Sequence, residues 1–343
     1  MDVRLTAEQV ALRESAARVV HQLGPRTVAQ LADSERAAKL DAAVGNSGWR
    51  ELRAATETGA AWASAVEAAI VAEELGRGLA DAAFLGPTLA AELRRLARMA
   101  PSTSIETVVL TPSLNDLAAM GDDGAVAIDA AGSTSALLVV ATSRGQHLAE
   151  VPVAGADAGV DLTRRAVVLD ASPAVALPTS GHPSLSGDNV TRWTALGLSL
   201  ACADLVGTMR GAIELACDYA RSRRQYGAAI GSFQAVQHLL ADAFVAMEGS
   251  RSVSLHAAWA VDALAPAEAL RAAAVAKAYC GRAARTVCET AIQLHGGIGN
   301  TWDCLAHVYL RRALLSIDVL GGVGVSLARV LEYDGIGGRG GLL

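Results

Sequence analysis

Aromatic and charged residues are scarce in this sequence. Phe, Trp and Tyr make up 4% of its 343 residues and Asp, Glu, Lys and Arg make up 19%, whereas apolar residues make up 52%. So few aromatic side chains favour a core of Ala, Leu and Val packed from helices over an aromatic-rich β-sandwich, and the apolar fraction excludes disorder as the dominant state. At roughly 150 residues per domain, the length allows two or three domains that need no disulfide or metal to fold.

Cysteines and basic runs are scarce as well. The five Cys residues are odd in number and form no Cys-x-x-Cys pair, and neither they nor the seven His residues stand at ligand spacing, so no metal site is expected. Lys and Arg number 29 against 35 Asp and Glu, a net charge of −6, and no Lys/Arg run could follow a phosphate backbone. These features argue against a nucleic-acid partner.

The sequence also contains no secretion signal and no clear membrane span. Residues 1–6 have no apolar h-region and no cleavage site. The long apolar stretch 194–217 carries Asp204, Arg210 and Glu214, which a bilayer would tolerate poorly. We therefore expect a cytoplasmic protein with reduced thiols and no membrane span.

Hydrophobic periodicity predicts an α+β fold that is mostly α. In residues 1–98, Thr6 and Gln9 have the spacing of a capping box at a helix start, and an Ala-rich apolar face over 60–76 predicts another helix. In residues 99–188, short β-prone runs alternate with Gly, Asp, Ser and Asn clusters, which predicts a small antiparallel β-domain. The runs are 107–110, 125–129, 136–141, 147–153 and 166–169.

The helical period returns after a loop-like boundary at 180–183 and persists through residues 189–343. Apolar residues recur at helical spacing over 205–247, and Pro266 can begin a further long helix that stops at Gly296. Consecutive amphipathic helices of this length form an antiparallel bundle of the four-helix type.

Two segments of the last third carry a family resemblance. Residues 221–242 read Arg-Ser-Arg-Arg-Gln-Tyr-Gly-Ala-Ala-Ile-Gly-Ser-Phe-Gln-Ala-Val-Gln-His-Leu-Leu-Ala-Asp, and residues 291–299 read Ala-Ile-Gln-Leu-His-Gly-Gly-Ile-Gly, with an Arg-Arg-Ala motif at 311–313. Together with the order of helical, β and helical segments, these motifs resemble the acyl-CoA dehydrogenases. Residues 5–9 and 73–77 add weaker support, so the resemblance covers the outer two thirds of the chain. It implies an N-terminal helical domain, a middle β-domain, a C-terminal helical bundle and FAD as cofactor.

The chemistry of these motifs suits a dinucleotide. Arg223 at a helix end can give a bidentate contact to a pyrophosphate, and the turn at Tyr226 and Gly227 lets the backbone approach it; alternatively, the arginines here form only a solvated basic cluster. Gln293 and the Gly-Gly pair after it place an amide and bare backbone beside a planar ligand, or are simply a glycine C-cap.

In the family, the corresponding positions bind the ADP half of FAD and reach across to the cofactor of the neighbouring subunit. The resemblance therefore implies seven candidate FAD contacts: Arg223, Gln225, Tyr226, Gln234, Gln293, Gly296 and Gly297. Close to them, His238 and His295 either line the cofactor cleft or serve in packing and capping.

A catalytic base is missing at both positions where the family carries one. Family members remove the α-proton of an acyl thioester with a carboxylate while the β-hydride moves to the flavin, so a base must lie in a dry pocket. In most members it is a Glu just before a Gly in the segment after the Arg-Asp-Ala motif, which is Leu320 here; in others it lies on the helix before the first motif, at about Gly197. Asp318 is the best remaining carboxylate, whereas Glu214 is expected to be an ordinary helical surface residue. No catalytic residue is therefore assigned.

The β-domain has also lost family motifs. Members carry a Tyr-Cys-x-Thr-Glu-Pro-like strand and loop and a Trp-x-Ser-like strand, which hold the isoalloxazine ring and part of the substrate. Residues 108–115 and 137–143 correspond to these stretches and lack the Glu, the Gly-Ser-Asp and the Trp. Both losses fall on the half of the site that holds the flavin ring, whereas the ADP-binding half is kept.

This one-sided loss favours a subunit that supplies half of a composite site. The sequence resembles the non-catalytic chain of actinobacterial heterotetrameric acyl-CoA dehydrogenases, notably those acting on steroid side chains. The resemblance implies a catalytic partner subunit in an α2β2 assembly, an acyl-CoA substrate such as a steroid CoA thioester, electron-transfer flavoprotein as the acceptor, and no activity of the chain alone. Two alternatives remain open: a self-sufficient homo-oligomeric dehydrogenase that uses Asp318, and a flavin-free scaffold of the same fold.

Overall fold

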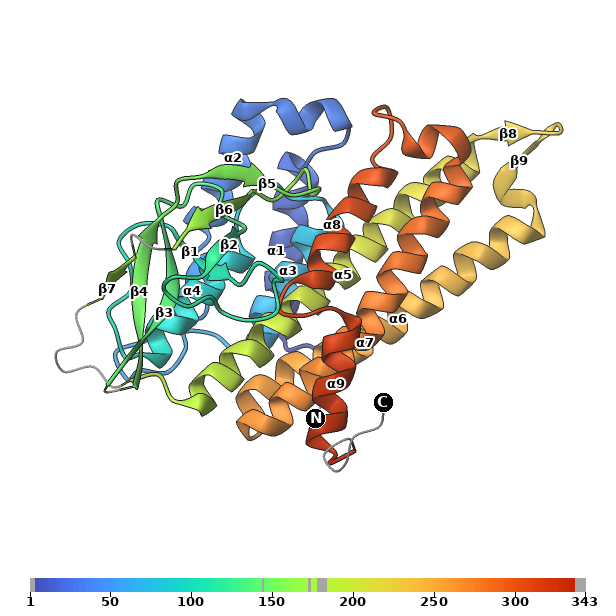
Figure 1. Ribbon diagram of the computed structural model, residues 1–343. Coiled ribbons are helices and arrows are strands. Elements are labelled where there is room, and N and C mark those ends of the chain that lie inside the picture. The colour runs from blue at the N-terminus through green and yellow to red at the C-terminus, as the bar shows by residue number, and fades with distance from the viewer. Residues whose placement is uncertain (1–3, 144, 172–173, 178–183, 337–343) are drawn as a thin grey trace.

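Helices precede and follow a central stretch of strands (Figure 1). The structure is a computed structural model that describes residues 4–143, 145–171, 174–177 and 184–336, so the expected boundary at 180–183 lies outside the described residues. The helices before the sheet are α1 (Ala7–Leu23), the 3₁₀ helix η1 (Val28–Ala32), α2 (Ser34–Asn46), η2 (Trp49–Glu51), α3 (Ala65–Arg77) and α4 (Leu85–Leu96). The α-helices after it are α5 (Gly187–Ser222), α6 (Gln234–Ala263), α7 (Pro266–His295), α8 (Ala306–Asp318) and α9 (Val323–Tyr333). The predicted α+β, mostly α class is confirmed.

The ends of the helices follow local signals. The hydroxyl of Thr6 accepts the N–H of Gln9 at 3.2 Å, and the Gln9 side chain accepts the N–H of Thr6 at 3.0 Å, so the predicted capping box is confirmed. Helix α3 begins five residues later than expected, because the chain turns back on itself in an isolated bridge between Ala55 and Ala61 and Ser64 then caps the helix. The Pro266 start and the Gly296 end predicted for α7 are both confirmed.

Within the described residues, the sheet has seven strands in the order β5-β6-β2-β1-β3-β4-β7. Their bounds are β1 (Glu106–Leu110), β2 (Asp123–Ile128), β3 (Ser135–Thr142), β4 (Gly145–Pro152), β5 (Ala156–Ala158), β6 (Ala166–Asp170) and β7 (Val175–Ala176). The expected antiparallel pairing is wrong for one pair, because β1 and β3 are parallel. Since β2 pairs antiparallel on one side of β1, the chain returns in the original direction and β3 adds to the free side of β1.

Helix α5 is the core of the molecule. It packs against α3, α6, α7 and α8, and the buried indole of Trp193 donates to the backbone oxygen of Leu89 on α4 at 3.0 Å. By length and hydropathy alone, α5 and the stretch Ala306–Tyr333 could each cross a membrane. The apolar window of α5 is 94% buried inside the protein, as in a core helix, and the second stretch contains a non-helical turn at 319–322, so both are weak evidence for a span. The predicted division after residue 98 falls between α4 and β1, and the one after 188 falls two residues inside α5.

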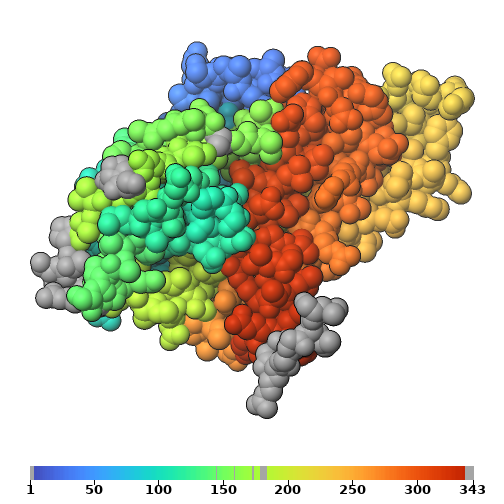
Figure 2. Space-filling model, viewed as in Figure 1, coloured from blue at the N-terminus to red at the C-terminus, as the bar shows by residue number. Residues whose placement is uncertain are grey.

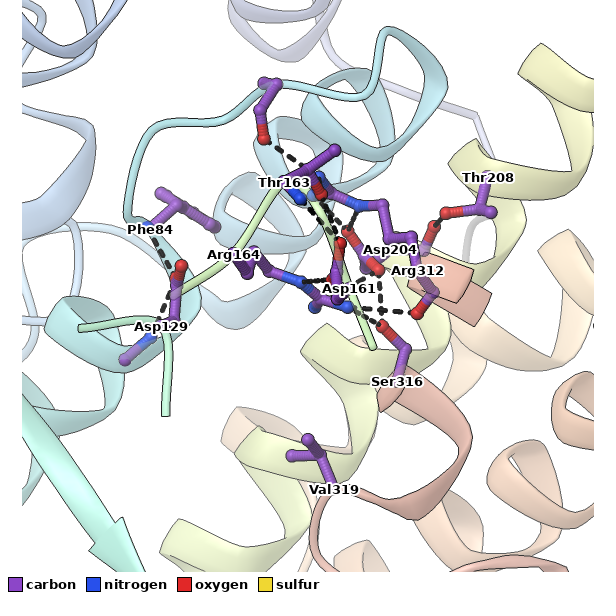
Figure 3. A network of polar contacts seen from close by, with 12 residues as sticks. Phe84, Asp129, Asp161, Thr163, Arg164, Asp204, Thr208, Arg312, Ser316 and Val319 are labelled. Carbon is purple, nitrogen blue, oxygen red and sulfur yellow. Dashed lines mark hydrogen bonds and ion pairs between the residues drawn. The ribbon is translucent and has the colours of Figure 1, made fainter. Parts of the chain in front are cut away.

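A buried network of charges joins the sheet to the bundle (Figure 3). Asp204 on α5 accepts hydrogen bonds from Arg312 on α8, at 2.7 and 3.0 Å, and from the hydroxyl of Ser316 at 2.6 Å. Arg164, in the loop before β6, donates to the same Ser316 hydroxyl at 2.8 Å and to Asp161 at 2.7 Å. Each of these side chains belongs to a residue that is no more than 8% exposed. The network therefore connects α5, α8 and the β-domain through one cluster of buried side chains.

The same network reaches the N-terminal helices. Arg312 donates to the backbone oxygen of Ala80, which follows α3, at 2.8 Å. Asp129, at the end of β2, accepts the N–H groups of Phe84 and Gly86 at the start of α4, at 2.7 and 3.2 Å. Burial opposes ionisation of Asp204, but Arg312 and Arg164 outweigh it and hold the pKa of this carboxyl below its ordinary value.

Replacing Asp204 with Asn should lower the free energy of unfolding by about 3–5 kcal/mol, because it leaves two buried guanidinium groups without their shared counter-charge. Urea unfolding measures this loss. Since the folded pKa of Asp204 lies below its unfolded value, the contribution is present above about pH 4 and is lost as the pH falls through the folded value.

The matched control is Asp218→Asn on the same helix, where an exposed pair with Arg221 contributes at most about 1 kcal/mol. A loss for Asp204→Asn that is no larger than this control would contradict the assigned role.

Candidate functional site

The two segments of the family resemblance meet at one end of the bundle. Helix α5 leads into a hairpin of β8 (Arg224–Gln225) and β9 (Ala228–Ala229), followed by η3 (Ile230–Ser232), and α7 leads into η4 (Gly296–Asn300). Figure 1 shows the hairpin projecting beyond the end of the bundle. The rings of Tyr219, near the end of α5, and His295, at the end of α7, are stacked with centroids 4.5 Å apart. We call this end, residues 219–234 and 293–299, the nucleotide end, after the FAD contacts that the sequence predicts there.

The hairpin turn exposes its side chains. Tyr226 and Gly227 both have positive φ, +53° and +79°, as the two central residues of a type I′ turn require. Tyr226 is 96% exposed. Arg223 is also exposed, and no carboxylate within the described residues pairs with it. This guanidinium is available to a ligand. Its exposure agrees both with a pyrophosphate contact and with a solvated basic residue.

The segment after α7 exposes backbone. Gly296 has φ +63° and ψ −143°, a conformation that only glycine adopts easily, and its N–H bonds to the backbone oxygen of Gln293. A Cβ atom built on Gly296 or Gly297 would meet nothing within 4 Å. The glycine pair is therefore a helix C-cap and also an open stretch of backbone, so the two interpretations are compatible.

All seven candidate FAD contacts are exposed and lie at the nucleotide end, in the two connections or in the helix ends beside them: Arg223, Gln225, Tyr226, Gln234, Gln293, Gly296 and Gly297. Their contact with FAD stays a prediction. His238 is exposed on α6, whereas His295 is buried, with its Nδ1 atom 2.7 Å from the backbone oxygen of Ala291.

The two possible base positions lie against each other. Leu320 is fully buried between α8 and α9 with φ +59°, and its side chain covers Gly197 on α5 so closely that a Cβ there would lie 2.1 Å from a Leu320 methyl carbon. The methyl groups of Leu89 lie 3.4 and 3.5 Å from the same point. Apolar groups therefore fill the space where a carboxylate from either position would stand, and none of them accepts a proton.

Two cations hold the turn that carries Leu320. The fully buried ammonium of Lys277 on α7 donates to the backbone oxygen of Val319 at 2.5 Å. Arg329 on α9 donates to the backbone oxygen of Leu320 at 2.6 Å and to that of Asn115 at 3.1 Å. Asn115 belongs to the loop between β1 and β2, which corresponds to a flavin-ring segment of the family. Figure 2 shows the teal residues of the β-domain packed directly against the red residues of α8 and α9.

The remaining carboxylates lie elsewhere. Asp318 is exposed at the end of α8. Glu214 is more than an ordinary surface residue, because it accepts from Arg77 at 2.9 Å and lies 3.3 Å from Arg210. Lys277 and Arg329 were not singled out from the sequence, although a lone lysine among the alanines of α7 is a signal of a buried, partnered cation.

Replacing Lys277 with Met should remove a pH dependence of stability. Burial lowers the pKa of Lys277 to about 8 from 10.5, so the unfolded chain binds the proton more tightly between these values. The stability of the wild type relative to Lys277→Met should therefore rise from about pH 8 to 10.5. Urea titrations at several pH values measure the difference. The exposed Lys39→Met is the control and should show no rise, and a flat difference for Lys277→Met would contradict a buried ammonium.

Comparisons with known proteins identify the family. A model of the acyl-CoA dehydrogenase C-terminal domain matches residues 196–323. The acyl-CoA dehydrogenase IpdE2 of Mycobacterium tuberculosis is 33% identical over 272 residues, which cover 77% of this chain and 76% of IpdE2. This chain therefore belongs to the acyl-CoA dehydrogenase family, as its motifs indicate.

Solved structures share the whole fold. A chain of the Tcur3481-Tcur3483 steroid ACAD matches with a TM-score of 0.78 at 21% identity, covering 96% of this chain and 98% of that one. A chain of the ChsE4-ChsE5 complex from Mycobacterium tuberculosis matches with a TM-score of 0.74 at 21% identity, covering 98% and 99%. Structures of this fold also include complexes with FAD, in agreement with the predicted cofactor. Within the described residues, no group of three or more His, Cys, Asp and Glu could hold a metal ion.

Proposed function

We propose that this chain is the non-catalytic, ADP-binding subunit of a heteromeric FAD-dependent acyl-CoA dehydrogenase. The observation that carries the proposal is the contact between Leu320 and Gly197. Desaturation of an acyl-CoA requires a carboxylate that removes the α-proton, and both positions that could supply it are apolar and face each other. The base must then come from a partner subunit.

The nucleotide end fits one half of FAD. The exposed guanidinium of Arg223 suits a pyrophosphate, and the open backbone of Gly296 and Gly297 lets a flat ligand approach closely. When bound, FAD supplies the acceptor for the substrate's β-hydride. The region around Leu320 fits the flavin ring poorly, because Arg329 donates both to the turn that carries Leu320 and to the loop between β1 and β2. We therefore assign the ring pocket to the partner.

The partner in this proposal is a second acyl-CoA dehydrogenase subunit in an α2β2 heterotetramer. Support comes from the similar structures, which include the ChsE4-ChsE5 complex and a steroid ACAD. By the same similarity the substrate is an acyl-CoA such as a steroid side-chain CoA thioester. The acceptor is an electron-transfer flavoprotein, and the assembly is soluble and cytoplasmic.

Purified alone, the chain should be colourless and inactive towards acyl-CoA thioesters, and both flavin colour and activity should appear when it is co-purified with its catalytic partner. Dye-coupled dehydrogenase assays and the flavin absorption spectrum measure this. Activity of the chain alone that Asp318→Asn abolishes would support the self-sufficient enzyme instead, and neither colour nor activity in any combination would support the flavin-free scaffold.

In the complex, Arg223→Ala should weaken FAD binding by about 10- to 100-fold, because charge-assisted hydrogen bonds to a phosphate contribute about 1.5–3 kcal/mol. Flavin fluorescence on dilution measures the dissociation constant. The control is Arg165→Ala in the β-domain, which removes a partly exposed guanidinium paired with Asp157 and should leave FAD binding unchanged. Equal affinities of the two variants would contradict the role of Arg223.

A further inference from the structure

The stacked rings of Tyr219 and His295 connect the two segments of the nucleotide end. They come from helices α5 and α7, and their planes are 27° apart at a centroid distance of 4.5 Å, within the range of offset-stacked aromatic pairs. His295 is 5% exposed and Tyr219 is partly buried. The pair thus lies in the chain next to the exposed Arg223 and Gly296, and it is less exposed than they are.

His295 has a fixed orientation. Its Nδ1 atom lies 2.7 Å from the backbone oxygen of Ala291, one turn back on α7. The thiol of Cys304, just before α8, forms a hydrogen bond with the same ring and also accepts the N–H of Ala306 at 3.5 Å. Burial favours the neutral ring, but the bonds to Cys304 and Ala291 outweigh it and raise the pKa of His295. The imidazole is therefore held by both α7 and the start of α8.

Each ring is directly connected to a segment that is predicted to bind FAD. The backbone oxygen of Tyr219 accepts the N–H of Arg223 at 2.8 Å, so the tyrosine lies at the point where the hairpin leaves α5. His295 precedes Gly296, and η4 folds back over it so that a Cβ on Gly299 would lie 3.0 Å from the His295 Cβ atom. The stacked rings hold the end of α5 against the end of α7, and a displacement of one helix end relative to the other would shift Arg223 relative to the glycine pair.

We propose that Tyr219 and His295 are positioning residues that fix the distance between Arg223 and the backbone of Gly296 and Gly297, so that both segments bind one nucleotide. This inference rests on the proposed function. When the two segments already have the spacing that the ligand needs, binding does not have to order them. The free-energy cost of ordering a mobile site is then avoided. The loss of an aromatic pair of ordinary strength corresponds to a change of roughly three- to tenfold in affinity.

The test uses the co-purified complex and its FAD dissociation constant. Tyr219→Leu and His295→Leu keep apolar volume but remove the stacked ring, and each should weaken FAD binding roughly three- to tenfold. Tyr219→Phe keeps the stacked pair and the bonds of His295 to Ala291 and Cys304, and should bind within twofold of the wild type. The double Leu variant should be no weaker than His295→Leu alone, because the stack is lost only once.

The matched control is His256→Leu. This residue forms a tilted pair with Trp259 on α6, roughly 33 Å along the helix axis from Gln234, and its loss should leave FAD affinity unchanged. Leu variants within twofold of the wild type, or a Tyr219→Phe variant as weak as Tyr219→Leu, would overturn the positioning role. A wild-type complex that holds no FAD would instead overturn the proposed function, so the two failures are distinguishable. Thermal unfolding of each complex separates lost affinity from a lost fold: variants that melt early and lose FAD in proportion to unfolding count against the positioning role.

Discussion

The structure depends on one buried carboxylate. Asp204 lies in the middle of α5 and holds Arg312 and Ser316 of α8, while Arg164 of the β-domain reaches the same group. Removing such charges from water is costly, so the arrangement is stable only when every partner is present. One carboxylate therefore fixes the relative position of the core helix, the last helices and the sheet.

Helix α5 runs without a break from this fixed point towards both of its ends. Gly197 lies near one end, against Leu320, and Tyr219 lies near the other, against His295, roughly 33 Å apart along the helix axis. The contact of Gly197 with Leu320 is closed and apolar. Beside the contact of Tyr219 with His295, by contrast, lie the exposed guanidinium of Arg223 and the open backbone of the glycine pair. In the proposed function this contrast separates two roles: the closed contact supplies no base, and the exposed end is the one predicted to bind the nucleotide.

Local signals made much of the fold predictable. The capping box of Thr6 and Gln9 and the helix between Pro266 and Gly296 follow from residues a few positions apart. The parallel pairing of β1 and β3 could not be predicted, because alternation shows which residues are buried but not which strand lies beside which. The family motifs led to the candidate FAD contacts and to Leu320. The contacts of Lys277 with Val319 and of Tyr219 with His295 join segments far apart in the chain, and no spacing in the sequence encodes them.

The number of flavins per assembly tests the central claim most directly. The complex of this chain with its catalytic partner is purified, its mass is determined by light scattering, and its FAD is released and quantified. A shared site, with the ADP half on this chain and the ring pocket on the other, predicts two FAD molecules per α2β2 tetramer. Four per tetramer would mean that every chain holds a complete cofactor, and the account would be wrong.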